Sequence, residues 1–356
     1  MTVAVRAPSV VGRFDELLGR PVSMRSLALL RVLAGPIVLL HLWPFLSSDH
    51  IYRDAFYEPY AGWYPEFPRA VYIALLWMGA VAAVVMALGW FTRVATATTF
   101  AIVAYNLFLS TTHFHNNRAY LVIVLAVLAV APCGRELSVD AWLRRRRGLP
   151  ALSLTSPGWP LWLLRFECAA VYGASGMSKL LDPDWFGGTV PWMRVVQARD
   201  ELPGWAPSLL TNRDFYTGAA KFIVLTELFI AVGLWSRRTR YAAIWVAVIF
   251  HVSIQLSANV QIFSVLGIAV LVIWAVPSAR DRVVVVDERW VAFVRGLDWL
   301  ARFRVQPGSR LELVDRDSTV LRGQPALLYL LSRLPLTAWF ALPTLLLPSV
   351  RRAGRT

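Results

Sequence analysis

Lys179 is the residue whose type and position are best suited to chemistry. It ends the segment Tyr172-Gly-Ala-Ser-Gly-Met-Ser-Lys179, which lies in a long apolar stretch. If this stretch is a helix of 3.6 residues per turn, Tyr172, Lys179 and the small residues at 175 and 176 share one face. An apolar environment disfavours the ammonium form of lysine, so the neutral amine would be available as a base. A lysine at a membrane edge whose side chain reaches the lipid headgroups explains the same position, and both interpretations stay open.

Further polar side chains lie at the ends of neighbouring apolar stretches. Asn117 and Arg118 form part of one polar turn, and His251 and Gln255, four residues apart, share a helix face. We therefore expect an outward-opening polar pocket lined by several helices. Its candidate catalytic residues are Lys179, Arg118 and His251, and its candidate binding residues are Asn117, Tyr172, Gly176 and Gln255.

The remaining groups with chemical potential give weaker signals. Glu227 is an ionisable residue inside an apolar stretch, which makes it a functional candidate by default. His113 and His115 have a spacing that metal ligands use, but no third or fourth ligand is evident, so we expect no metal site. Cys133 and Cys168 lie in or beside apolar stretches, and we expect buried, inert thiols rather than a disulfide framework.

The composition requires that these residues be carried by a membrane protein. Apolar residues make up 57% of the 356 residues, charged residues only 16%, and the mean hydropathy is +0.53. Soluble domains reach about 45–50% apolar residues even with glycine counted, and about 25% charged residues. The net charge of +14 arises mainly between apolar stretches, so we expect contact with anionic lipid and no binding of nucleic acid.

We predict an all-α polytopic membrane protein with about eight transmembrane helices, because each apolar stretch is close to the 20 residues that a span needs. Seven or nine spans remain possible. The predicted spans are residues 26–46, 70–91, 94–112, 118–133, 160–180, 218–235, 240–257 and 259–277. Arginines are concentrated in alternate connecting segments, which predicts cytoplasmic N- and C-termini. No removable signal peptide is evident at the N-terminus.

Two connecting segments on the predicted outer side, about 47–69 and 181–217, are rich in aromatic residues. Trp63, Tyr64, Trp185 and Trp192 are examples. Tryptophan and tyrosine favour the headgroup layer, so an aromatic belt explains them. A cover over a site that opens to the outer leaflet is the alternative.

The chain changes character after the last apolar stretch. Val283–Val286 and Leu311–Val314 predict strands, and helices are predicted over about 290–300 and 326–334. This pattern indicates a small cytoplasmic α/β domain. We expect domains at 1–24 (N-terminal tail), 25–278 (membrane) and 279–356 (α/β), with an interfacial or packing helix at 336–349.

Two motifs give the chain a resemblance to a known family. They are Asn116-Asn-Arg-Ala-Tyr-Leu121 and Gly176-Met-Ser-Lys-Leu-Leu-Asp-Pro-Asp-Trp185. Both resemble the vitamin K-dependent γ-carboxylase-like membrane domain, also called the HTTM domain. Phe250-His251 with Ile262-Phe-Ser264, and Arg25 with Arg31-Val-Leu-Ala-Gly-Pro36, are similar too. The resemblance covers about residues 20–280.

The resemblance implies a function for Lys179. In animal carboxylases of this family, a lysine in the matching segment deprotonates reduced vitamin K, and oxygen then drives epoxide formation and glutamate carboxylation. Lys179 is the matching position. This chain departs from the carboxylases in having one lysine, followed by an additional leucine, where they have two. Arg118 stands where they carry a histidine; a guanidinium stabilises an oxyanion but does not shuttle protons.

The C-terminal part resembles the DCC family, whose fold is thioredoxin-like. Val283-Val-Val-Val-Asp287 and Val314-Asp-Arg-Asp-Ser-Thr-Val-Leu-Arg-Gly-Gln-Pro-Ala326 carry this similarity. The segment after the first strand contains no cysteine. Disulfide exchange requires a thiolate, so the resemblance implies a redox-inactive domain with a structural or partner-binding role.

These observations favour a bacterial-type, carboxylase-like membrane protein. We expect it to bind a reduced isoprenoid quinone, of menaquinone or vitamin K type, and to couple epoxidation to deprotonation or carboxylation of an unknown substrate. A secreted peptide is one possible substrate. The alternatives are a non-catalytic membrane factor for maturation, export or immunity of a secreted peptide, and a quinone-binding redox subunit.

Overall fold

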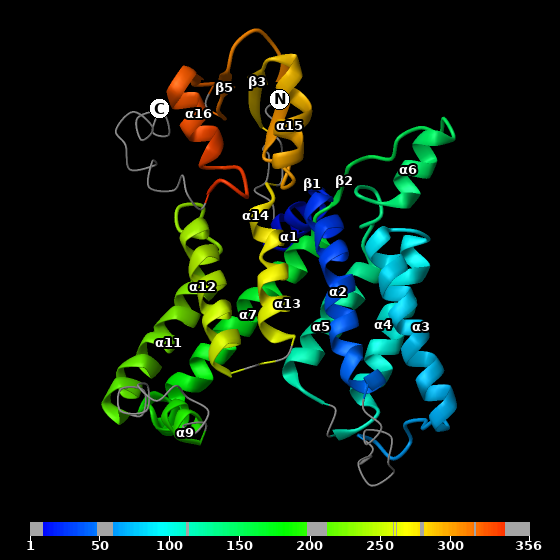
Figure 1. Cartoon of the computed structure of the whole chain (residues 1–356), viewed down its shortest axis with the longest axis vertical. Helices are drawn as coiled ribbons and strands as arrows, with labels where there is room; N and C mark the ends of the chain where they lie inside the picture. The colour runs from blue at the N-terminus through cyan, green and yellow to red at the C-terminus, as the bar shows by residue number, and fades with distance from the viewer. Residues whose placement is uncertain are drawn as a thin grey trace, which may run out of the picture. The chain divides into compact units, whose positions relative to one another are not determined.

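The computed structural model of the chain is mainly helical (Figure 1). It describes residues 10–47, 60–111, 114–197, 212–258, 260, 262–277, 281–316 and 318–338. The chain divides into two compact units. One comprises Leu30–Ala131 and Trp159–Trp274; the other comprises Met1–Leu29, Pro132–Gly158 and Ala275–Thr356.

All eight predicted apolar spans contain helix. They are α2 (Arg25–Ser47), α3 (Arg69–Leu88), α4 (Thr92–Phe108), α5 (Asn116–Val130), α7 (Trp159–Leu181), α11 (Arg213–Gly233), α12 (Arg240–Ala258), and α13 (Phe263–Val270) with α14 (Val272–Ala275). Within the described part of the chain, three helices are long and apolar enough to cross a membrane: α2, α3 and α11. The expected count of eight spans is therefore not supported. A helix of 15 residues such as α5 extends only about 22 Å, less than the roughly 30 Å of a hydrocarbon core.

The last predicted span, 259–277, differs from expectation because its helix is interrupted at Leu271, between α13 and α14. Arg165 of α7 binds this region: its Nε and Nη2 donate to the carbonyl oxygen of Ile273 at 3.1 and 2.8 Å. The guanidinium also lies 5.0 Å from the ring centre of Trp274. A buried cation is thereby satisfied by a backbone carbonyl and an aromatic face.

The helices of the first unit pack in chain order. Helix α3 packs on α4 and α4 on α5; α7 packs on α11, α11 on α12 and α12 on α13. Helix α2 approaches α3 closely at Gly35, because this residue has no side chain: a Cβ there would lie only 2.6 Å from Ala87 Cβ. Nearby, buried Arg31 donates to the carbonyl oxygens of Met86 and Ala87. These carbonyls belong to the C-terminal turn of α3, which favours a cation.

The second unit contains a small α/β fold with two more strands than predicted. Its elements are β3 (Arg282–Val286), α15 (Glu288–Leu297), β4 (Phe303–Pro307), β5 (Glu312–Val314), β6 (Val320–Arg322) and α16 (Gly323–Leu331). The sheet order is β4-β3-β5-β6, with β3 parallel to β4 and the other pairs antiparallel. Neither β4 nor β6 was predicted, because β4 alternates apolar and polar residues over only four positions before a proline, and β6 has only three residues.

The same unit contains short elements from the earlier segments. They are α1 (Val10–Gly19), β1 (Pro21–Ser23), α6 (Val139–Arg146) and β2 (Thr155–Pro157). Strands β1 and β2 pair in antiparallel fashion. Arg135 donates to the carbonyl oxygens of Ser153 and Thr155 at 3.2 and 2.8 Å, which holds the segment that forms β2.

Some predictions concern residues outside the described part of the chain. Most of the helix predicted at 336–349 lies there, as do His113 and residues 48–59 and 198–211 of the two aromatic segments. The predicted outer segment 181–217 is described at 181–197 and 212–217. It contains α8 (Pro183–Phe186), α9 (Thr189–Gln197) and the start of α11. Trp63, from the other aromatic segment, is 82% exposed. This agrees with either a belt or a cover.

Candidate functional site

Lys179 lies in the last turn of α7 and forms an ion pair with Glu227 of α11. Its Nζ donates to Glu227 Oε1 at 2.9 Å and to Oε2 at 2.8 Å. It also donates to Ser175 Oγ, one turn earlier on α7, and Ser175 Oγ donates to Glu227 Oε1 at 2.9 Å. The three N–H donors of an ammonium group are thus matched by three oxygens.

The two members of the pair differ in exposure. The Glu227 side chain is 3% exposed, whereas that of Lys179 is 16% exposed. Lys179 Nζ also lies 5.2 Å from the ring centre of Trp185, in the helix that follows α7. The pair therefore has a buried acidic side and an accessible basic side.

Gly176 explains how α7 and α11 approach closely enough for this pair. A Cβ at Gly176 would lie 3.1 Å from Leu228 Cδ2 and 3.2 Å from Glu227 Cβ, tighter than ordinary contact. Small residues at a helix interface permit such packing. The structure thus gives Gly176 a role in helix packing next to Glu227.

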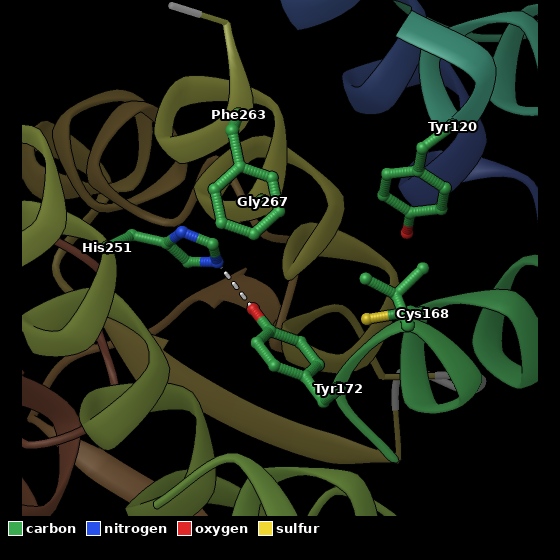
Figure 2. Close-up of a pocket in the computed structure, with 7 residues that line it drawn as sticks. Tyr120, Cys168, Tyr172, His251, Phe263 and Gly267 are labelled. Carbon is green, nitrogen blue, oxygen red and sulfur yellow. Dashed lines mark hydrogen bonds between the residues drawn. The ribbon is translucent and has the colours of Figure 1, made fainter. Parts of the chain in front are cut away.

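A second polar group lies two turns earlier on α7. The Tyr172 hydroxyl and His251 Nε2 of α12 are 2.6 Å apart and form a hydrogen bond (Figure 2). His251 is only 1% exposed. A methyl group at Gly267 of α13 would overlap the imidazole, so this glycine makes room for the ring.

A small cavity adjoins this pair. Its lining is Tyr120, Cys168, Val171, Tyr172, His251, Phe263 and Gly267 (Figure 2). The cavity volume is about 10 Å³, comparable to the roughly 10–15 Å³ that one buried water needs. It cannot admit the ring of a quinone.

Unpartnered polar atoms continue along α12. Neither His251 Nδ1 nor Gln255 Oε1 has a hydrogen-bond partner within the described residues, and both atoms are buried. Helices α7 and α12 run in the same direction (Figure 1). Gln255 is therefore displaced from His251 in the same sense as Ser175 is from Tyr172, toward the level of Lys179.

The predicted site residues fall into separate groups. Tyr172 joins His251, and Gly176 lies against Glu227, the partner of Lys179. Tyr172 and Lys179 are seven residues apart, which is about 10 Å along a helix. Arg118 contacts α2, with its guanidinium 5.1 Å from the ring centre of Phe45. The Asn117 backbone N–H donates to His115 Nδ1 at the start of α5.

Sequence reasoning did not foresee three members of these groups in their roles. Glu227 was noticed only as an isolated intramembrane acid, although an acid in a span signals a buried cationic partner. Ser175 was expected on the face of Lys179 but not as a ligand of the pair. Tyr120 gave no signal beyond its place in the Asn116–Leu121 motif.

Both cysteines are free and buried, as predicted. Among the described residues, no group of three or more histidine, cysteine, aspartate or glutamate side chains could hold a metal ion. His115 is described, but His113 is not, so their pairing is untested.

Comparison with known proteins identifies one family. The HTTM domain matches residues 19–278, which is most of the chain. This range includes α7, α11 and α12, the helices that carry the two polar groups. The chain belongs to the HTTM domain family. No curated protein and no solved structure matches it. HTTM membership and the apolar helices indicate a membrane protein of the vitamin K-dependent carboxylase-like type.

Proposed function

We propose that this HTTM protein binds a reduced isoprenoid quinone beside Lys179 and uses Lys179 as the base that removes a hydroxyl proton from it. The observation that carries the proposal is the Lys179–Glu227 pair, with a buried carboxylate behind a partly exposed amine. Such a pair in an apolar span is costly and marks a functional site by default.

Glu227 supplies what a neutral lysine requires. The base must be a neutral amine, which forms when the proton of Lys179 Nζ passes to Glu227 across the hydrogen bond of 2.8 Å between them. This leaves a neutral amine beside a neutral carboxylic acid. The amine then accepts a proton from a bound hydroxyl, and the ammonium group that forms stabilises the negative charge left beside it.

The accessible side of Lys179 suits a ligand that arrives from the lipid. Met177, Leu180 and Leu181 are 47%, 37% and 73% exposed around it. A quinone whose tail remains in the bilayer needs no enclosed cavity to reach this face, and the cavity at His251 is too small for the ring.

A bound reduced quinone would supply electrons, and dioxygen the oxidant, for epoxide formation. The coupled substrate would be a carbon acid such as a secreted peptide that reaches the outer side. This arrangement follows if both termini are cytoplasmic, as the arginine distribution predicts. On the same proposal the C-terminal domain is a DCC-like, redox-inactive module.

The test is an epoxide assay that needs no knowledge of the coupled substrate. Membranes that contain wild type, Lys179→Ala or the double variant Lys179→Met/Glu227→Gln are incubated with reduced menaquinone and oxygen. Quinone epoxide is then measured by mass spectrometry. We expect epoxide from wild type alone, because both variants lack the amine.

The chain provides a matched control, because it has one other lysine, Lys221 of α11. Lys221 Nζ lies over the ring of Phe186, 5.6 Å from its centre. Lys221→Ala should form epoxide at the wild-type rate. Epoxide formation that persists in both Lys179 variants would refute the assignment of the base.

A non-catalytic membrane factor is the second candidate, and one observation favours it. All three N–H donors of Lys179 are already used by Ser175 and Glu227, as in a purely structural ion pair. This candidate predicts that Lys179→Met/Glu227→Gln, which preserves a neutral interface, retains biological function at normal abundance. The base proposal predicts that function is lost.

A further inference from the structure

The cavity beside His251 combines a water-sized space with a poorly satisfied hydroxyl. Tyr120 is 7% exposed, and within the described residues its hydroxyl meets only the Cys168 thiol, which is a weak hydrogen-bonding group. The hydroxyl points toward Cys168, into the space that the lining residues enclose (Figure 2). A buried hydroxyl that lacks a strong hydrogen-bond partner destabilises the fold, so a ligand that accepts from it is favoured.

We propose that this cavity is a binding site for one ordered water molecule, held between the Tyr120 hydroxyl and the Tyr172–His251 pair. The volume of about 10 Å³ admits a single water. The Tyr172 oxygen retains a lone pair when its O–H donates to His251 Nε2, so it accepts from the water. The water in turn accepts from Tyr120, so both tyrosine hydroxyls gain a partner.

The bound water also orients the proton of His251. When Tyr172 donates to Nε2, the imidazole proton is on Nδ1. Nδ1 then presents an N–H, with the Gln255 Oε1 acceptor one turn away on α12. Tyr120 therefore acts as a positioning residue: through the water and Tyr172, it fixes which nitrogen of His251 is a donor.

Radiolytic footprinting of the full-length protein in lipid nanodiscs tests the site without reference to quinone chemistry. X-ray pulses generate hydroxyl radicals from bound water, and these oxidise adjacent buried side chains. Cys168, which lines the cavity, and Cys133, outside it, are 2% and 1% exposed. We expect Cys168 to oxidise several-fold faster than Cys133 in the wild type.

Two variants locate the water. Tyr120→Phe removes one hydroxyl, and Gly267→Ala places a methyl group against the His251 ring at the cavity wall. Both should reduce the Cys168 rate to that of Cys133. Gly173→Ala is the matched control, because a Cβ there makes only an ordinary 3.7 Å contact with Ala231; it should leave the rate unchanged.

Two results would overturn the proposal. Equal rates for Cys168 and Cys133 in the wild type mean a dry cavity. A fast Cys168 rate that neither Tyr120→Phe nor Gly267→Ala alters means that water reaches the thiol by another route. Because quinone is not added, neither result depends on whether Lys179 is a base.

Discussion

Lys179 and Tyr172 lie on the same face of α7, but the two polar groups that they form are stabilised inside the protein in different ways. At Lys179, an ion pair with Glu227 neutralises a charge, and the lysine remains 16% exposed. At Tyr172, two neutral side chains share one hydrogen bond, and His251 is 1% exposed. The charge of Lys179 lies near the end of α7 and is balanced by Glu227, whereas the group at Tyr172 is formed by two neutral side chains. Proton transfer from a ligand therefore belongs to the Lys179 group, and hydrogen-bond orientation to the Tyr172 group.

Removing only one member of the ion pair should have the largest effect on stability. Lys179→Ala leaves Glu227 as a buried carboxylate without its cation, which we expect to lower the free energy of unfolding by about 3 kcal/mol. The double variant Lys179→Met/Glu227→Gln should recover most of this loss, because no charge remains buried. Thermal unfolding in one detergent compares them. If Lys179→Ala is as stable as the double variant, then loss of the lysine does not leave an uncompensated charge on Glu227.

Alanine substitutions at two glycines should have the next largest effect on stability, and they test the neutral Tyr172–His251 group. Gly267→Ala forces the His251 ring to shift, and such overpacking costs about 1–3 kcal/mol. Gly173→Ala, on the face of α7 near Ala231, should stabilise the protein by about 0.5–1 kcal/mol through helix propensity. The measurement is the shift in unfolding midpoint, and equal shifts would mean that the imidazole has room to move.

The apolar stretches of the sequence predicted where the helices lie, but not how many of them are long and apolar enough to span a membrane. Continuous apolar runs produce α2, α3 and α11 with edges within a few residues of expectation, except at the start of α11. Length in the sequence does not show where a helix breaks: the interruption at Leu271 occurs where Arg165, more than 100 residues earlier, binds the carbonyl oxygen of Ile273. This is a tertiary interaction with no local signal.

The site was predictable on one helix and not across helices. Spacing alone gave the face shared by Tyr172, Gly176 and Lys179. Which residues of α11 and α12 meet that face depends on helix rotation and axial shift, which periodicity leaves undetermined. Glu227 and His251 were consequently recognised as polar residues, but their partners were found only in the structure.

Hydrogen-bond deletions on the two groups should differ more modestly. Tyr172→Phe leaves His251 Nε2 buried without a partner, a loss of about 1–3 kcal/mol. Ser175→Ala removes a hydroxyl beside Glu227, but the carboxylate keeps both bonds from Lys179, so we expect a loss of about 1 kcal/mol or less. Chemical denaturation distinguishes them. A larger loss for Ser175→Ala would reverse the assignment of which group is more deeply buried.

The smallest effect concerns an ion pair in the α/β fold, which shows how a carboxylate behaves beside water. Burial raises the pKa of Asp315, but hydrogen bonds from Tyr329, from the Arg316 N–H and from Arg282 outweigh it, and the pKa is lowered overall. The Arg282 Nε–Asp315 Oδ1 distance is 2.7 Å. Because the folded pKa lies below the unfolded value of about 3.9, the stabilisation is present above that pH and is lost as the pH falls through the folded pKa.

Asp315→Asn should therefore reduce the stability of this sheet by about 1 kcal/mol at pH 6 and by progressively less below pH about 4. Hydrogen exchange of the β3 and β5 amides measures the difference within the full-length protein. Glu312→Gln is the control, since its partner Arg322 is 73% exposed and such pairs contribute little. If Asp315→Asn loses as much stability at pH 3 as at pH 6, the carboxylate's charge does not stabilise the sheet. In that case Asp315 and Glu227 would differ only in their hydrogen bonds, because the exposure of each carboxylate to water would have no measurable effect.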